Sequence, residues 1–148
     1  MIAIRKTEDL NELLAWRREV IEHVFGLVPD EALMRANKVY YKKQIADGMQ
    51  LAYIASNDNE GVGCGAICLS EELPSPDNPS GKCAYLMNIY VRQGYRAQGI
   101  GHAIVRKLMD EAKKRGCGKI YLETTPDGRS LYESLGFKDL PDMMKLSR

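Results

Sequence analysis

Apolar residues at helical spacing dominate the first part of the chain. Leucine, isoleucine and valine recur every three or four positions over Leu10 to Phe25, which predicts an amphipathic helix after a short strand at Ile2 to Ile4. The segment Gly26-Leu27-Val28-Pro29 breaks this helix. A second, partly apolar helix is expected from Asp30 to Ile45, and Asp47-Gly48 ends it.

The pattern then changes to that of strands. Gln50 to Ser56 and Val62 to Leu69 are joined by a polar turn, which predicts an antiparallel hairpin. Three prolines between Pro74 and Gly81 predict a loop, because proline cannot donate to a ladder. Cys83 to Val91 is apolar on nearly both faces, as is typical of a central strand.

The last third of the chain alternates helices and strands. A third helix follows Gly99 and ends at Lys113-Lys114-Arg115-Gly116, whose cations and glycine suit a helix C-terminus. Lys119 to Thr124 is predicted as a strand, Arg129 to Leu135 as a short helix, and Met143 to Leu146 as a last strand. The order is β-α-α-β-β-β-α-β-α-β, which predicts a mixed α/β fold.

Composition limits the class of protein. The 148 residues fit a single domain over residues 1–148, and the formal net charge of +1 argues against a general nucleic-acid binder. No apolar stretch approaches the ~20 residues that span a bilayer. The N-terminus lacks the apolar segment of a signal peptide, so a cytoplasmic location is expected. The four cysteines and two histidines lack zinc-ligand spacing, so no metal is expected and the cysteines are interpreted as core residues.

A glycine-rich turn, Arg92 to Gly101, connects the central strand to the third helix. Such a turn presents free backbone N–H groups at the positive end of the helix dipole, which is a site for a phosphate. The spacing of Gly94 and Gly99 fits a nucleotide P-loop, but Ile100-Gly101 stands where Lys-Ser/Thr must reach the phosphates and magnesium. A dinucleotide turn also fails, because Ile104 occupies the position of its third glycine.

The pattern that remains, Arg96-Ala97-Gln98-Gly99-Ile100-Gly101, resembles the pyrophosphate loop of the GNAT-type N-acetyltransferases, which bind acetyl-CoA. Leu86 to Val91 resembles the family's fourth strand. Gly128 to Phe137 resembles its late helix, with the ending Leu-Tyr-x-x-x-Gly-Phe. These motifs cover about the C-terminal half of the chain, in the family's order. One departure is Thr124 to Gly128, which lacks the asparagine that many members carry there.

The resemblance implies a mixed, mostly antiparallel sheet of six to seven strands, with splayed central strands and four flanking helices. Acetyl-CoA would lie as a co-substrate where Cys83–Val91 and Lys119–Thr124 part. The residues implied to bind it are Ile89, Tyr90, Val91, Arg96, Ala97, Gln98, Gly99, Ile100 and Gly101. Arg92 and Arg96 would add positive charge beside the pyrophosphate.

The resemblance also implies an N-acetyltransferase in which a primary amine attacks the thioester directly. Tyr132 matches the family's general acid, since a pKa near ~10 keeps it protonated at neutral pH; the alternative is an aromatic of the core. Asn88 is a polar residue in an apolar strand, so it would either orient substrate or a water, or bond to neighbouring backbone. The general base is open between Glu123, Glu71, Glu72 and water.

The acceptor is expected to be a small-molecule amine, bound beside the first two helices. Residues in or near those helices are Trp16, Arg17, His23, Phe25, Tyr40 and Tyr41. Arg17 or Arg18 could bind a carboxylate of the acceptor, and His23 could act as a base. The alternative function is a non-catalytic acyl-CoA-binding sensor or regulatory module. Members of the family often dimerise, so a homodimer fits the resemblance, and neither a nucleic-acid nor a membrane partner is expected.

Overall fold

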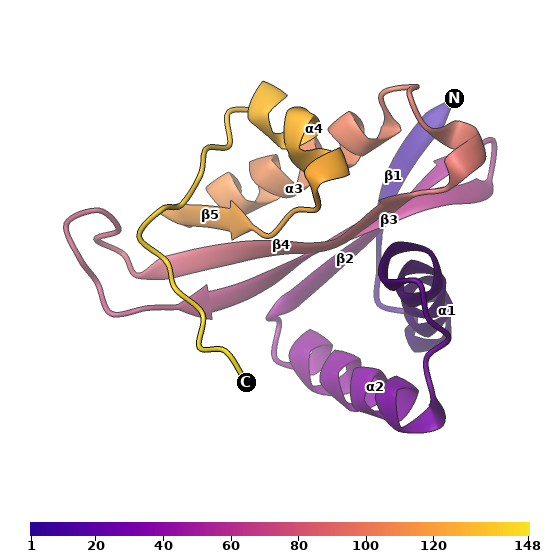
Figure 1. The fold of residues 1–148 in the computed structure, drawn as a ribbon, viewed down its shortest axis with the longest axis horizontal. Helices are drawn as coiled ribbons and strands as arrows, with labels where there is room; N and C mark the ends of the chain where they lie inside the picture. Colours follow the sequence, from indigo (N-terminus) through magenta and orange to yellow (C-terminus); the bar gives the residue numbers. More distant parts are fainter.

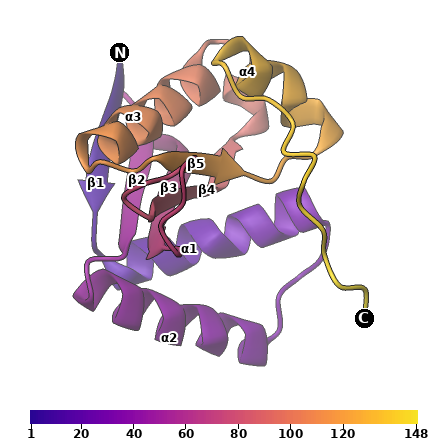
Figure 2. The same cartoon turned by 90° about the vertical axis from the view of Figure 1, so that its left-hand side faces the viewer.

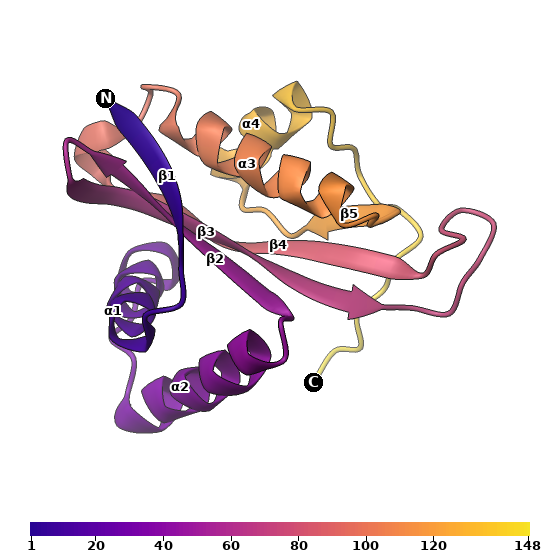
Figure 3. The same ribbon diagram turned by 180° about the vertical axis from the view of Figure 1, so that it is seen from behind.

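A sheet of five strands in the order β1-β2-β3-β4-β5 forms the centre of the computed structural model, which describes residues 1–148. Two helices cover each of its faces: α1 and α2 lie on one side, and α3 and α4 lie on the other (Figures 1 and 2). Seen from behind, β1 forms one edge of the sheet (Figure 3).

The strands are β1 (Ile2–Thr7), β2 (Gln50–Asn57), β3 (Glu60–Glu71), β4 (Lys82–Val91) and β5 (Lys119–Leu122). The helices are α1 (Leu10–Val20), α2 (Glu31–Ala46), α3 (Ile100–Lys114) and α4 (Arg129–Ser134). Three short segments are a π-helix, η1 (Ile21–Phe25), and two 3-10 turns, η2 (Gln93–Tyr95) and η3 (Pro126–Gly128). Neighbouring strands are antiparallel, except that β5 runs parallel to β4.

Aspartates begin both N-terminal helices. The Asp9 carboxylate accepts a hydrogen bond from the backbone N–H of Glu12 at 3.2 Å, and the Asp30 carboxylate accepts one from Leu33 at 2.8 Å. Each bond satisfies an N–H that has no partner inside its helix, and such a cap stabilises a helix by about 1 kcal/mol. The caps therefore determine where the two helices that cover one face of the sheet begin.

The largest part of the core lies between the sheet and α3. Ile104 and Leu108 of α3 are almost fully buried and belong to the same apolar cluster as Ile67 and Leu86 of the sheet. Smaller clusters hold α1 and α2 on the opposite face, one of them around Trp16. Because burial of one such side chain stabilises the fold by about 1.5–3 kcal/mol, α3 is firmly fixed on β3 and β4.

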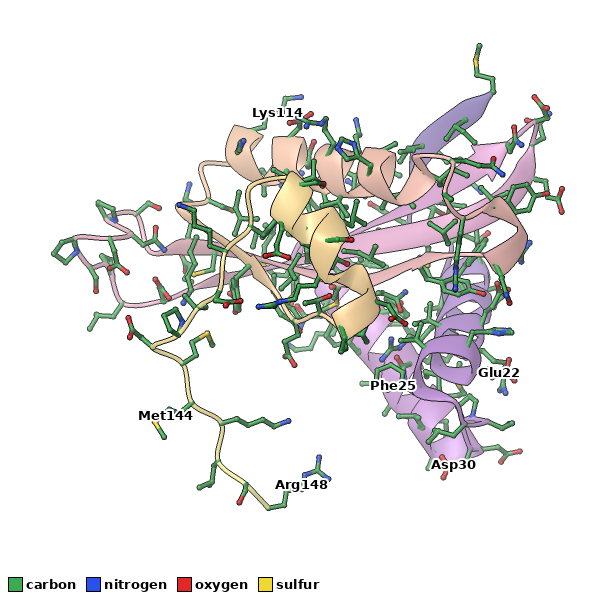
Figure 4. The ribbon with its side chains drawn as sticks, turned by 45° about the horizontal axis from the view of Figure 1, so that its top comes forward. Glu22, Phe25, Asp30, Lys114, Met144 and Arg148 are labelled. Atoms are coloured by element: carbon green, nitrogen blue, oxygen red, sulfur yellow. The ribbon has the colours of Figure 1, made fainter.

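The sheet ends at β5, so it has five strands rather than six or seven. The prediction of a strand at Met143 to Leu146 is wrong: this segment pairs with no strand, and Met144 is 99% exposed. Figure 4 shows Met144 and Arg148 on a tail that leaves the body of the protein. A short apolar segment can form a strand only where the edge of another strand is available to pair with it. The mostly antiparallel sheet and the four flanking helices are confirmed.

No helix has both the length and the apolar character needed to cross a lipid bilayer.

Candidate active site

The strands β4 and β5 pair over only part of their length. Residues Cys83 to Leu86 pair with Lys119 to Leu122, and β4 then continues from Met87 to Val91 without a partner on that side. Backbone N–H and C=O groups along this stretch face the gap between the strands and need other partners. The predicted splay of the central strands is therefore present.

A β-bulge lies at the point where the strands part. The pairing of β3 with β4 passes from Ala66–Met87 to Cys64–Tyr90, so Asn88 and Ile89 together face Gly65. Asn88 has φ +56°, a left-handed conformation that asparagine adopts more readily than most residues. A bulge leaves one residue outside the ladder and redirects its backbone groups. Sequence reasoning singled out Asn88 but missed the bulge, although a lone asparagine in an apolar strand is a signal for one.

The glycine turn before α3 presents a run of unpaired amides. The first helical bond of α3 runs from the N–H of Ala103 to the carbonyl of Gly99, at 3.0 Å. None of the N–H groups from Ala97 to His102 donates to a backbone carbonyl. Ala97 at φ +62° and Gly99 at φ +80° turn the chain so that these amides precede the helix. Together with the helix dipole they form a site that fits the pyrophosphate of acetyl-CoA.

Both arginines of this turn bind other groups of the protein. Nε of Arg96 donates to the Val91 carbonyl at 2.9 Å, which ties the exposed turn to the end of β4. Arg92 binds the Glu19 carboxylate through Nε at 2.8 Å and Nη2 at 2.9 Å, and lies 4.6 Å from the centroid of the Trp16 ring. Arg92 therefore joins the sheet to α1, and its charge is already neutralised by Glu19.

Tyr132 lies on α4 beside the main core. It is 9% exposed, its ring meets Phe137 edge-on at 5.9 Å between centroids, and burial raises its pKa. No protein group bonds its hydroxyl, which nevertheless is not sealed from solvent. The side chain borders a cavity of about 750 Å³ between α3, β5, α4 and the segment after α4. Tyr132 is thus a core aromatic that also lines a cavity, and its hydroxyl has no partner in the protein.

Gly128 leaves room for the Tyr132 ring and the Thr124 hydroxyl to lie close to the backbone at the start of α4. A Cβ at Gly128 would lie 2.8 Å from Oγ1 of Thr124 and 3.1 Å from Cε2 of Tyr132. These distances are shorter than ordinary van der Waals contacts, so no larger residue fits without movement.

The side chain of Asn88 is bound by α1 rather than by backbone alone. Nη1 of Arg17 donates to Oδ1 of Asn88 at 2.8 Å, and Nε of Arg17 donates to Oδ1 of Asn37 at 3.1 Å. The Phe25 ring lies 5.7 Å from the Arg17 guanidinium. Figure 4 shows Phe25 and Glu22 on opposite sides of the η1 segment. The η1 turn therefore brings an aromatic ring over the cation that holds the bulge.

Of the other residues expected near the acceptor, some pack against the protein and one is exposed to solvent. His23 stacks on Tyr90 at 6.0 Å between ring centroids, and Tyr41 is buried between α1, α2 and the sheet. The hydroxyl of Tyr40 donates to Oε1 of Gln50 at 2.6 Å. Arg18 is exposed. Of the two arginines considered for a carboxylate, only Arg17 reaches the bulge.

The candidate bases differ in how they are engaged. Oε1 of Glu123 accepts a hydrogen bond from the Tyr85 hydroxyl at 2.9 Å, and Glu123 borders the same cavity as Tyr132. Glu72 binds Nδ2 of Asn78 at 3.0 Å and Nζ of Lys119 at 3.1 Å. These hydrogen bonds lower the pKa of Glu72, which makes it a weaker base and an anchor of the β3–β4 loop. Glu71 is exposed at the end of β3.

The chain matches the acetyltransferase (GNAT) family over residues 10–137. It is 28% identical over 163 aligned positions to thialysine N-epsilon-acetyltransferase of Sus scrofa, covering 96% of this chain and 86% of that protein. A shorter match, 42% identical over 59 residues, covers 38% of this chain and 40% of the [ribosomal protein bS18]-alanine N-acetyltransferase of Escherichia coli K12.

The fold agrees with a solved structure over nearly the whole chain. A predicted acetyltransferase from Clostridium acetobutylicum, crystallised with acetyl-CoA, superposes with a TM-score of 0.88 at 27% identity. The superposition covers 99% of this chain and 96% of that one.

Proposed function

The chain belongs to the acetyltransferase (GNAT) family and is an acetyl-CoA-dependent N-acetyltransferase; we propose that it acetylates a primary amine of a small molecule, with Tyr132 as the general acid. One observation carries the proposal. The unpaired amides of Ala97 to His102 follow the open edge of β4, and α4, which carries the free Tyr132 hydroxyl, packs against this turn, since a Cβ at Gly101 would lie 3.3 Å from Cδ2 of Leu131 and 3.8 Å from Cγ2 of Val91. Family membership favours this enzyme over a non-catalytic sensor.

Acetyl-CoA supplies a thioester whose acetyl group is transferred when an amine attacks it. In the proposal, the amides from Ala97 to Gly101, with Arg96 beside them, hold the pyrophosphate. The stretch of β4 without a β5 partner, at Ile89, Tyr90 and Val91, would bind the amide groups of the pantetheine arm, as an added strand would, apart from the Val91 carbonyl, which Arg96 occupies. The open edge of β4 and the amides before α3 supply the hydrogen-bonding groups that this requires.

The reaction makes three demands on the protein. The attacking amine must be neutral, because an ammonium group has no lone pair. An N–H at the bulge around Asn88 and Ile89 would donate to the carbonyl oxygen as it gains negative charge, which is a strong catalytic contribution in a dry site. The sulfur leaves with the electron pair of the broken C–S bond and needs a proton, which the Tyr132 hydroxyl would donate.

Burial supports the role of Tyr132. Because its pKa is raised, the hydroxyl stays protonated across the range in which amines begin to lose their protons. Glu123, on the same cavity, is a candidate to accept the proton that the amine releases, either directly or through water. Asn88, which lies in the bulge, would orient the substrate or a water beside the thioester.

The small-molecule acceptor is supported by the relative that matches most of the chain. The Sus scrofa protein is named for thialysine, a small amine, and the match covers 96% of this chain. The match to the enzyme named for a ribosomal protein covers only 38% of it.

The test is an acetylation assay with a panel of small amines, followed by free-thiol release and by the mass of the product. Tyr132→Phe should lower kcat about 100-fold and leave the Kd for acetyl-CoA unchanged, because it removes only the proton donor. Tyr53→Phe, a buried tyrosine on β2, is the matched control and should keep full activity. A normal kcat in Tyr132→Phe would show that Tyr132 is not the general acid. Acetylation of proteins alone, with none of the small amines modified, would show that the acceptor is not a small molecule.

A further inference from the structure

The Arg17 side chain joins three elements at the edge of the proposed reaction site. From α1 it donates to Asn88 on β4 at 2.8 Å and to Asn37 on α2 at 3.1 Å. Asn88 lies in the bulge where β4 loses its β5 partner. The guanidinium is therefore next to the place where an amine must approach the thioester, on the face of the sheet covered by α1 and α2.

The positive charge of Arg17 has no counter-charge in the protein. Both of its partners are neutral amide oxygens, and none of the ion pairs of the chain includes Arg17. Glu19, an acid on the same helix, is bound to Arg92. Tyr41 and Cys64, on which the Arg17 charge acts, are neutral at pH 7, since burial raises the pKa of each to about 12. A partly buried cation without an anion is costly unless a ligand supplies one.

Several donors of the guanidinium are also unused. Arg carries five N–H donors in a planar fork, and the two hydrogen bonds above engage only Nε and one N–H of Nη1. The Nη2 group has no partner in the protein. Phe25, which covers the guanidinium at 5.7 Å, is 60% exposed, so the neighbourhood is open to a small molecule. A planar fork of this kind is suited to a carboxylate.

We propose that Arg17 determines acceptor specificity by binding a carboxylate carried by the amine substrate, so that the acceptor class is amino acids and related amino carboxylates. The inference rests on the proposed function, because it needs the amine to enter beside the bulge. Arg17 thereby has two roles: Nη1 fixes Asn88, and the free edge of the guanidinium orients the acceptor. Arg18, the next residue on the helix, is exposed and has neither contact.

The experiment compares amino acids with their carboxamides, which differ only in the carboxylate. The wild-type protein should acetylate the amino acid with a kcat/KM about 10- to 100-fold above that of its carboxamide. Arg17→Gln should remove this preference, mainly by raising KM for the amino acid. Any loss of activity that follows from the release of Asn88 falls on both compounds alike, so the ratio of their kcat/KM values is the readout. Arg17→Lys keeps the charge and should restore part of the preference. Arg18→Gln should behave as wild type.

A binding measurement separates this inference from the proposed function. Titration of the same compounds into the protein saturated with CoA reports acceptor binding without any acetyl transfer. If thiol release fails with every amine but the bound amino acid still depends on Arg17, the proposed reaction is wrong and the carboxylate site stands. Equal kcat/KM values and equal affinities of the wild type for the amino acid and its carboxamide would overturn the carboxylate site. An equal loss for both compounds in Arg17→Gln also overturns it and makes Arg17 a support of the bulge alone.

Discussion

At the scale of single residues, backbone conformation decides where the turn before α3 presents its amides. Gly94 and Gly99 both have open space where a Cβ would stand, but only Gly99 has a positive φ, +80°. The two glycines therefore separate the effect of conformation from the effect of space.

Gly99→Ala should strain the turn by about 1–2 kcal/mol, because a left-handed conformation brings an L-residue's Cβ close to the backbone. We expect the Kd for acetyl-CoA to rise about 10-fold as the amides lose their alignment, measured by calorimetric titration. Gly94→Ala is the control in the same turn and should change the Kd far less. Equal effects of the two substitutions would contradict a conformational role for Gly99.

Gly128 acts through space instead. An alanine there would force the Thr124 hydroxyl to rotate and the Tyr132 ring to move, since the Cβ would lie 3.1 Å from Cε2. Gly128→Ala should lower kcat about 10-fold with little change in acetyl-CoA binding, because a small displacement of a catalytic group is costly. Ser130→Ala, at an exposed position of α4, should be neutral. Unchanged kcat in Gly128→Ala would show that the ring position does not limit the reaction.

At the scale of elements, α1 is attached to the sheet by long-range polar contacts as well as by its apolar face. Arg92 and Glu19 form a two-pronged ion pair across 73 positions of sequence, and Nη1 of Arg92 also donates to the Gly61 carbonyl at 2.7 Å. The pair lies at the end of β4 from which the glycine turn starts, so it fixes α1 relative to the proposed cofactor site.

We expect a coupling free energy of about 1 kcal/mol between Glu19 and Arg92 in a double-mutant cycle of Glu19→Gln and Arg92→Gln, measured by urea unfolding. The value is modest because both side chains remain partly exposed, at 39% for Arg92 and 23% for Glu19. The Arg35–Glu31 pair on α2 is more exposed, at 70% for Arg35 and 95% for Glu31, and should couple by no more than ~0.5 kcal/mol. A coupling at Arg92 no larger than this control would contradict the attachment.

At the scale of the whole molecule, the order of elements could be predicted because helices and strands leave different periodicities in the sequence. The residues of the glycine turn could be singled out for a similar reason, since the turn is local. The Arg17–Asn88 contact spans 71 positions and could not be predicted, because it depends on how α1 packs on the sheet. The strand at Met143 to Leu146 was wrong because its local pattern is that of a strand but no sheet edge receives it.

The same long-range packing makes the stability of the whole molecule sensitive to alkaline pH. Cys64 and Tyr41 are buried between the sheet and the first two helices, and burial raises the pKa of Cys64 from 9.0, and of Tyr41 from 10.0, to about 12. In the unfolded chain both groups lose their protons at the lower values. The folded state therefore holds more protons between pH 9 and pH 12, so its stability is fully present below pH 9 and falls as the pH rises.

The free energy of unfolding should fall above pH 9 by up to about 1.4 kcal/mol per pH unit for each such group. Urea unfolding at pH 7, 9, 10 and 11 measures this slope. Cys64→Ala should be less stable than wild type at pH 7, because it leaves a cavity. Its free energy of unfolding should nevertheless fall less steeply between pH 9 and pH 10, because the contribution of the thiol to the slope is gone. The comparison depends on the slope and not on the stability at one pH, so the cavity does not confound it. Parallel slopes for wild type and Cys64→Ala would mean that the thiol ionises as readily in the folded protein as in the unfolded chain.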